Sequence, residues 1–299
     1  MLRKSLSVTF ILVFAASVAK AADTAKPFTG ISAAEIVNRN VAARGGLQAW
    51  RAVHSMTWIG TLGAGGNRQA PVPTSLEHKK VTPLPTDPRP KEEVQLPFKM
   101  EMERPRKQRF EILFKGQTAL QVYDGVNGWK LRPYLNRMEV EPFNADELKT
   151  ASAQMELDGP LVDYAAKGSQ VELDGMEKVE DRDTYKLKLT MKDGRAIHLW
   201  VDANTFLESK IEGTPRQLDG VQHPVEVYYR DYRQVNGLQI PFVLETKVLS
   251  VSKAALIPRA WNGPVPAEKI VIDKVEVNPN LEESLFVKPQ VQTASIHHP

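Results

Sequence analysis

The sequence predicts a mainly β protein: an open, strongly curled antiparallel sheet, or unclosed barrel, with a helical lid. Apolar and polar residues alternate in several separate segments, as in strands with one buried and one wet face. Turn pairs such as Asn236-Gly237 join neighbouring segments into hairpins. A helical segment interrupts the order in mid-chain, and helices are the usual cover for an apolar sheet face. About a dozen strands in a meander would curl.

Residues 1–21 have the pattern of a secretory signal peptide. Arg3 and Lys4 precede an apolar run at 6–18, which is too short to span a bilayer as an uncleaved anchor. Ala19-Lys20-Ala21 then supplies the small residues that signal peptidase needs. We therefore expect export and cleavage after Ala21.

Composition excludes several classes of protein. The chain has no cysteine, so it has neither a lipid attachment site nor disulfides, and the fold must depend on its core. Residues 1–21 contain three basic and no acidic residues, which leaves 36 of each kind in the mature chain. This balance gives no electrostatic basis for nucleic-acid binding.

The first elements follow from local signals. Ser32-Ala33-Ala34-Glu35 is a capping box, and Val37 and Val41 continue one apolar helix face until Gly45-Gly46. A short turn at 47–53 leads into a strand at 55–62. Residues 63–93 then hold many glycines and prolines without periodicity, which indicates a long inserted loop.

Hairpins and a lid are expected after this loop. Asn127-Gly128, Asp193-Gly194 and Asn236-Gly237 have the composition of type I′ turns. Asn144 begins a second capping signature, and Leu148, Ala151 and Met155 form its apolar stripe. Asp158-Gly159-Pro160 ends that helix, and Leu161, Val162 and Tyr164 indicate a second short helix that ends at Gly168.

No pattern indicates catalysis, a metal site or a cofactor site. The histidines are scattered without the i, i+4 spacing that places two imidazoles on one helix face. On strand spacing, His198 lies on the polar side, so a solvated role is favoured over a catalytic one. The chain contains no Gly-x-Ser-x-Gly elbow, no cysteine nucleophile and no complete phosphate loop. We therefore expect no catalytic or metal-binding residues, no cofactor and no enzymatic activity.

The chain resembles the LolA-like outer-membrane lipoprotein-sorting proteins. The resemblance spans most of the mature chain, but its motifs are turn and core signatures rather than a site. They are 157–164, Asp202 with 206–208, 229–232, 235–242, 275–279 and 285–289, joined by Gly45-Gly46, Trp50, 123–125 and Gly128-Trp129.

The resemblance implies an unclosed barrel whose concave apolar face holds acyl chains under helices, in a periplasmic carrier without a cofactor. We place a single domain at 22–290, with a disordered tail at 291–299. The expected cavity and lid residues are apolar; they are Met100, Met102, Phe110, Ile112, Phe114, Leu120, Val122, Leu148, Met155, Leu161, Tyr164, Leu187 and Leu189.

The implied cargo is lipoprotein acyl chains or another lipid, carried toward the outer membrane. The implied partners are an inner-membrane transporter and an outer-membrane acceptor. Two other functions remain open. The same cavity would serve a lipid-sensing or lipoprotein-sensing accessory subunit of an envelope complex, and a lipid hydrolase is a third, less favoured hypothesis.

Overall fold

The computed structural model describes residues 30–65, 93–133, 137–153, 156–218, 221–249 and 268–290. The contacts between residues group 31–299 as one compact unit, apart from 1–30. The expected signal peptide, the tail at 291–299 and Met155 lie outside the described residues. In the expected loop at 63–93, residues 63–65 and 93 belong to strands, and residues 66–92 lie outside the described residues. The domain bounds therefore stay a prediction.

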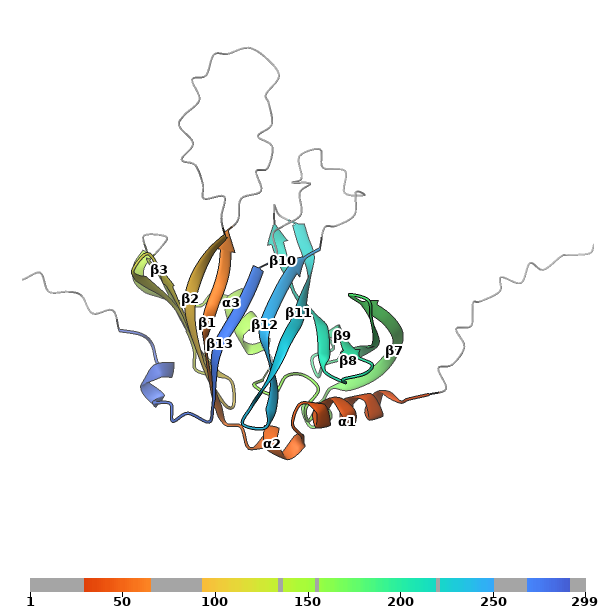
Figure 1. Cartoon of the computed structure of the whole chain (residues 1–299). Coiled ribbons are helices and arrows are strands. Elements are labelled where there is room, and N and C mark those ends of the chain that lie inside the picture. The colour runs from red at the N-terminus through yellow and green to blue at the C-terminus, as the bar shows by residue number, and fades with distance from the viewer. Residues whose placement is uncertain are drawn as a thin grey trace, which may run out of the picture. The chain divides into compact units, whose positions relative to one another are not determined.

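The described strands form one 13-stranded antiparallel sheet that does not close into a barrel (Figure 1), which confirms the predicted fold class. In the sheet they follow the order β6-β5-β4-β3-β2-β1-β13-β12-β11-β10-β9-β8-β7. Their bounds are β1 Ser55–Gly65, β2 Glu93–Glu103, β3 Lys107–Phe114, β4 Gln117–Tyr123, β5 Gly128–Arg132, β6 Arg137–Pro142, β7 Gln170–Val179, β8 Arg182–Thr190, β9 Ala196–Asp202, β10 Glu208–Leu218, β11 Val221–Val235, β12 Leu238–Val248 and β13 Glu268–Val277.

Two features of this order position the lid. The first and last strands, β1 and β13, pair with each other and so join two meanders into one sheet. The sheet edges are then β6 and β7, which are consecutive in the chain. The segment between them includes helix α3 (Ala145–Ala153), which lies within the curve of the sheet in Figure 1.

The N-terminal helices follow the predicted signals. Helix α1 (Ala33–Ala43) begins where the Ser32 hydroxyl accepts a hydrogen bond from the backbone N–H of Glu35 at 3.1 Å. Gly45 has a φ of 114°, and a Cβ there would lie 2.4 Å from the carbonyl oxygen of Gly237. Only glycine fits this approach, which brings the helix end against the β11–β12 turn. Helix α2 (Leu47–Arg51) follows.

The turn predictions are correct at one site. Asn236 and Gly237 both have positive φ, 49° and 83°, which confirms a type I′ turn. At Asp193-Gly194 only the glycine has positive φ, so the turn is of another type. At Asn127-Gly128 neither residue has a positive φ. The Asp124 carboxylate accepts hydrogen bonds from the backbone N–H groups of residues 126 and 127 and shapes that turn instead.

Other residue pairs adopt the type I′ conformation instead. Lys115-Gly116 joins β3 to β4, and Glu180-Asp181 joins β7 to β8, each with two positive φ values. Strand register therefore imposes left-handed backbone even on Glu180, which has no intrinsic preference for it.

The described part of the lid contains one α-helix rather than the two predicted. The Asn144 side chain accepts from the N–H of Glu147, and the Glu147 carboxylate accepts from the N–H of Asn144, so the capping box forms as predicted. The predicted second helix, from Leu161 to Gly168, is wrong: residues 157–168 form consecutive turns. Asp163 has a φ of 52°, which no helical residue adopts, and its side chain pairs with Arg51.

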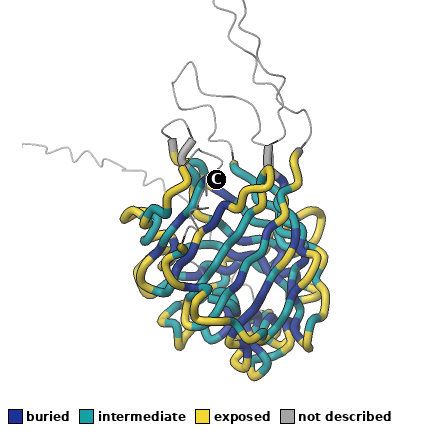
Figure 2. Tube along the Cα trace, turned by 90° about the vertical axis from the view of Figure 1, so that its left-hand side faces the viewer, coloured by how far each residue is buried: buried dark blue, intermediate teal, exposed yellow. Residues whose placement is uncertain are grey.

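Buried residues follow the strands in Figure 2 and form two apolar clusters. The first surrounds Trp50 and Ile240 and includes Val162 from the lid. The second surrounds Leu187 and Leu199 and includes residues of α1 and Leu161. Consecutive lid residues thus pack into different clusters.

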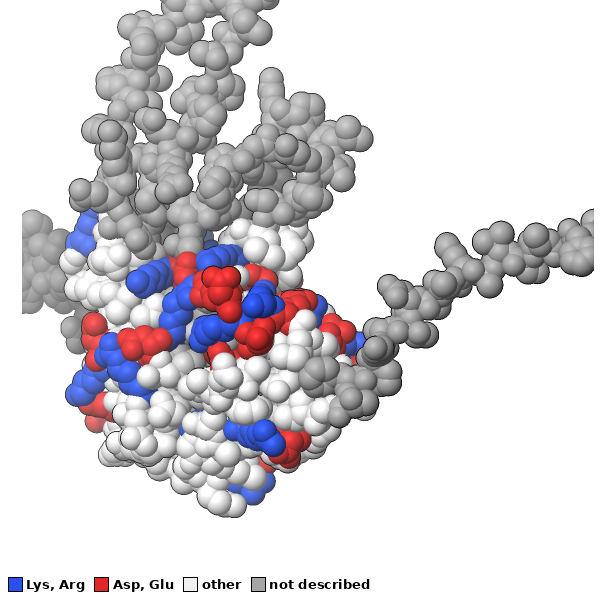
Figure 3. Space-filling model, turned by 45° about the vertical axis from the view of Figure 1, so that its right-hand side comes forward, with Lys and Arg blue, Asp and Glu red and all other residues white. Residues whose placement is uncertain are grey.

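The outer side of the sheet is polar where β8 to β12 lie. Basic and acidic side chains are intermingled over the face seen in Figure 3. Lys210, which precedes the buried Ile211, pairs with Glu226 at 2.6 Å, and Arg230 pairs with Glu245 at 2.7 Å. These pairs join neighbouring strands on the side opposite the second cluster.

Candidate functional site

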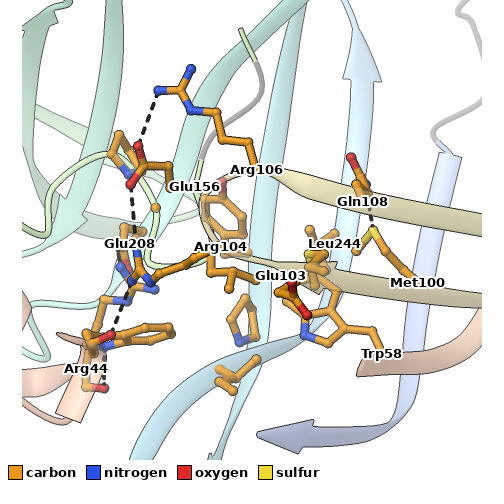
Figure 4. Close-up of a pocket in the computed structure, with 18 of the residues that line it drawn as sticks. Arg44, Trp58, Met100, Glu103, Arg104, Arg106, Gln108, Glu156, Glu208 and Leu244 are labelled. Carbon is orange, nitrogen blue, oxygen red and sulfur yellow. Dashed lines mark hydrogen bonds and ion pairs between the residues drawn. The ribbon is translucent and has the colours of Figure 1, made fainter. Parts of the chain in front are cut away.

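A cavity of about 440 Å³ lies between the inner face of the sheet and the lid (Figure 4). This volume is within the range of small-molecule binding sites. Its apolar and aromatic lining comes from β1, β2, the lid, β9, β11, β12 and α2; these residues are Trp50, Trp58, Met100, Met102, Leu157, Leu199, Tyr229, Ile240 and Leu244.

The strand register explains why these side chains share a face. Met100 pairs with Trp58 on β1 and with Phe110 on β3. Residues paired across neighbouring strands point to the same side, and residues two apart on one strand do so too. Met102 therefore joins Met100, while Glu101 between them points to the other side.

Arginines of the β2–β3 turn hold the lid at one side of the cavity. Arg104 donates to the buried carboxylate of Asp158 at 2.8 Å and to the carbonyl oxygen of Val53 at 2.7 Å. Arg106 donates to the carbonyl oxygen of Ser152 at 2.8 Å and to Glu156 at 3.2 Å. The lid is therefore attached to the sheet through its acidic groups and a carbonyl.

Two further ion pairs fix the lid elsewhere. Arg51 of α2 makes a bidentate pair with Asp163, at 2.6 and 2.8 Å, which holds the pKa of Asp163 below its usual value. Lys130 of β5 pairs with Glu147 of α3. Burial raises the pKa of Glu147, but the hydrogen bonds from Lys130 and the Asn144 N–H outweigh it, so that pKa is lowered.

A buried charge pair lies at the base of the cavity. Arg44, the C-cap residue of α1, lies 3.3 Å from Glu208 and donates to the carbonyl oxygen of Asp158 at 2.7 Å. Its guanidinium stacks 4.4 Å from the ring centroid of Trp50. Arg44 thereby links α1, the sheet and the lid at one point.

Two tyrosines surround this pair. The Tyr232 hydroxyl donates to Glu208 at 3.2 Å, and Tyr229 lines the same cavity. Burial, followed by the charge of Glu208, raises the pKa of both phenols. Both are therefore neutral at ordinary pH and offer hydroxyl groups rather than charge.

The structure brings part of the predicted site together. Met100 and Met102 line the cavity, and Phe110 and Ile112 pack in the same cluster. Leu161, Tyr164 and Leu187 meet in the second cluster. Leu189 is buried on β8, Leu148 is half-buried on α3, and Phe114 is half-buried at the end of β3; none of these lines the cavity.

Leu120 and Val122 lie on the other side of the sheet from the cavity. Val122 pairs with Arg109, and Arg109 with Glu101, whereas the cavity residue Met102 pairs with Gln108. The short helix η2 (Glu283–Phe286), with its buried Phe286, contacts β3 and β4. These two predicted cavity residues therefore belong to the outer face.

Sequence reasoning missed the polar residues of the site. Arg44, Arg104, Arg106 and Glu208 are separated in sequence by up to 164 positions, and no local motif links them. The nearest signal is Arg104-Pro105-Arg106, which marks a turn between two strands.

A second cavity of about 400 Å³ lies between the N-terminal helices and the lid. It is lined by Val41 and Leu47 on one side and by Leu161 and Tyr164 on the other. Two predicted lid residues thus face α1 and α2 rather than the strands alone.

The described residues contain no group of three metal-ligating side chains. His198, considered above for catalysis, has its Nδ1 2.9 Å from Glu212 and its Nε2 3.4 Å from Asp174. It therefore sits in a surface ion cluster. Within the described part of the chain, no helix is long and apolar enough to cross a membrane.

Comparisons with known proteins show similarity in structure. No family model and no curated protein matches the sequence. A LolA superfamily protein from Nitrosomonas europaea aligns with a TM-score of 0.50 and 13% identity, over 87% of this chain and 99% of that one. A putative outer membrane lipoprotein-sorting protein domain from Vibrio parahaemolyticus aligns at 0.48 and 11%, over 84% and 94%. The sheet order, the lid between its edges and the first of these alignments agree: this chain has a LolA-like fold.

Proposed function

We propose that this protein is a periplasmic binding protein that shelters acyl chains of lipoproteins or other lipids during transfer toward the outer membrane. The observation that carries the proposal is the apolar cavity of about 440 Å³ under a lid attached by ion pairs. The signal-peptide pattern of residues 1–21 supports the location.

The chemistry of the wall supports an apolar ligand. Met100 and Met102 have flexible, polarisable side chains that adapt to irregular apolar surfaces. Each methylene group of a ligand that leaves water for such a wall contributes about 0.8 kcal/mol. A chain of ten methylenes would gain about 8 kcal/mol before ordering costs, which is enough for useful binding.

The attachment of the lid supports reversible access. Arg51 and Arg106 have half-exposed side chains, and exposed ion pairs contribute about 0–1 kcal/mol each. Opening the part of the lid around Ser152 and Glu156 therefore breaks weak contacts, while Leu161 and Val162 can stay packed in the two clusters. A transfer protein needs such a lid, because its cargo has to enter and leave.

The experiment is to purify the mature protein from its host's periplasm, extract it with organic solvent and identify lipids by mass spectrometry. We expect about one equivalent of acyl lipid in the wild type. Leu244→Trp, which narrows the cavity, should carry less lipid, whereas Leu113→Trp, at an exposed position of β3, should carry as much as the wild type. Lipid retained in full by both variants, or absent from the wild type, would refute the proposal. Turnover of added lipid would instead favour a hydrolase.

A further inference from the structure

We infer that the cavity accepts the acyl part of an amphiphile whose anionic head group binds Arg106 at the cavity rim. This inference rests on the proposed function and names its ligand class. It comes from two features: the apolar wall of the cavity and the distribution of charge around it.

The wall of the cavity suits an acyl chain. The cavity of about 440 Å³ is within the range of small-molecule binding sites. Its wall offers Trp58, Met100 and Leu244 to a methylene chain.

The interior excludes the charged end of such a ligand. Glu208 is buried and already paired with Arg44, so the base of the cavity carries no net positive charge. An incoming carboxylate or phosphate would lose its hydration there and meet the like charge of Glu208. The apolar tail, by contrast, fits against Trp58, Ile240 and Leu244.

Among the described cations that line the cavity, Arg106 has the most exposed side chain. Lys107 is held by Glu103 and Glu283, and Arg104 by Asp158 and backbone carbonyls. Arg106 is 47% exposed; it donates to the carbonyl oxygen of Ser152 at 2.8 Å and to the carboxylate of Glu156 at 3.2 Å. A guanidinium can bind a carboxylate or phosphate in a bidentate manner. Figure 4 shows Arg106 at the edge of the site, directed toward Glu156.

Head-group binding and lid attachment then compete for the same side chain. An anion on Arg106 displaces Glu156, and Glu156 is part of the lid. The ligand thereby weakens one lid contact as it binds, while its chain adds apolar contacts with Leu157 of the same lid.

The test is a titration at pH 8, where fatty-acid carboxylates are ionised, with stoichiometry measured by native mass spectrometry and affinity by the intrinsic tryptophan fluorescence, to which Trp50 and Trp58 at the cavity contribute. The probes are hexadecanoate, 1-palmitoyl-glycerol-3-phosphate, hexadecan-1-ol and a tripalmitoylated lipopeptide. We expect one molecule of each single-chain probe per protein, with both anions binding more tightly than the alcohol. The anion that binds more tightly indicates whether the natural head group is a carboxylate or a phosphate.

Variants separate the head group from the chain. Arg106→Gln should weaken anion binding about tenfold and leave the alcohol unchanged, whereas the control Arg137→Gln, on the edge strand β6, should change neither. The role of Arg106 would be refuted if Arg106→Gln weakened the binding of the anions and of the alcohol equally. It would also be refuted if the variant bound both anions as tightly as the wild type does. Binding of the lipopeptide alone would refute the inference of an anionic amphiphile but leave the proposed function standing. No binding of any probe would refute the proposed function itself.

Discussion

The two halves of the inner sheet face differ in how they are covered. Around β8 to β10, helix α1 and the lid residue Leu161 pack against the strands, and Leu187 and Val201 are fully buried. Around β1 to β3, Met100, Met102 and Phe110 are only partly buried and the cavity lies beside them. Both halves have the same alternating pattern, so the pattern alone does not distinguish a core from a binding site.

The difference comes from the cover rather than from the strands. Helix α1 ends at Arg44 and contacts β7, on the filled side. On the other side the cover is the lid, which packs through Val162 and is attached by ion pairs at its margin. The half around β8 to β10, the filled half, should therefore determine the stability of the fold. The half around β1 to β3, the open half, should determine ligand binding.

The largest expected effect is on stability in the filled half. Leu187→Ala should lower the free energy of unfolding by about 2–5 kcal/mol, because it leaves a cavity in a closely packed core. Met100→Ala should cost less, since that side chain already borders empty space. Urea unfolding measures both. Equal losses would mean that the two halves are packed alike.

The next effect is on binding in the open half. Leu244→Trp should exclude about three methylenes of a bound chain and cost about 2.4 kcal/mol of affinity. Its effect on stability should be small by comparison. Titration with hexadecanoate checks the affinity, and urea unfolding checks the fold. A variant that binds as the wild type does would show that the chain lies elsewhere.

A smaller effect is expected at the lid contacts. Arg104→Gln removes one partner of the buried Asp158, which Lys167 still neutralises, and should weaken lid attachment by about 1 kcal/mol. Lipid should then exchange about fivefold faster. Stopped-flow fluorescence gives the exchange rate. Slower exchange, or an unchanged rate, would contradict a role of Arg104 in closing the lid.

The smallest effect concerns pH. Arg51 lowers the pKa of Asp163 in the folded state, so this pair stabilises the lid above the unfolded pKa and loses its effect as pH falls through the lower folded value. We expect lipid exchange to accelerate below about pH 4. Asp163→Asn should exchange faster already at neutral pH and lack this component. Identical pH profiles for variant and wild type would exclude the pair as a contributor.

Local patterns predicted the fold because the sheet is almost entirely a meander. Alternation placed β2, β3, β8 and β12, and the capping boxes at Ser32 and Asn144 placed two helices. The second lid helix was predicted wrongly because its apolar spacing is helical, while the pairing of Asp163 with Arg51 holds that residue in a left-handed conformation. A contact between residues 112 positions apart overrides local propensity there.

The site was predictable only where it repeats the strand pattern. Met100 and Met102 followed from alternation, but the same reasoning assigned Leu120 and Val122 to the cavity. Alternation assigns side chains to the two faces of the sheet but does not indicate which face lines the cavity. Leu120 and Val122 lie on the outer face, where η2 contacts β3 and β4. Arg44 and Glu208 meet only through the tertiary fold.

The central claim, that an acyl chain occupies the open half, can be tested with the methionine methyl groups as reporters. In protein labelled with ¹³C at these methyls, we expect hexadecanoate to shift the signals of Met100 and Met102 and to give nuclear Overhauser contacts with them. Met138 and Met176, which are exposed on the edge strands β6 and β7, should not respond. Contacts at Met138 or Met176 with none at Met100 and Met102 would contradict the account.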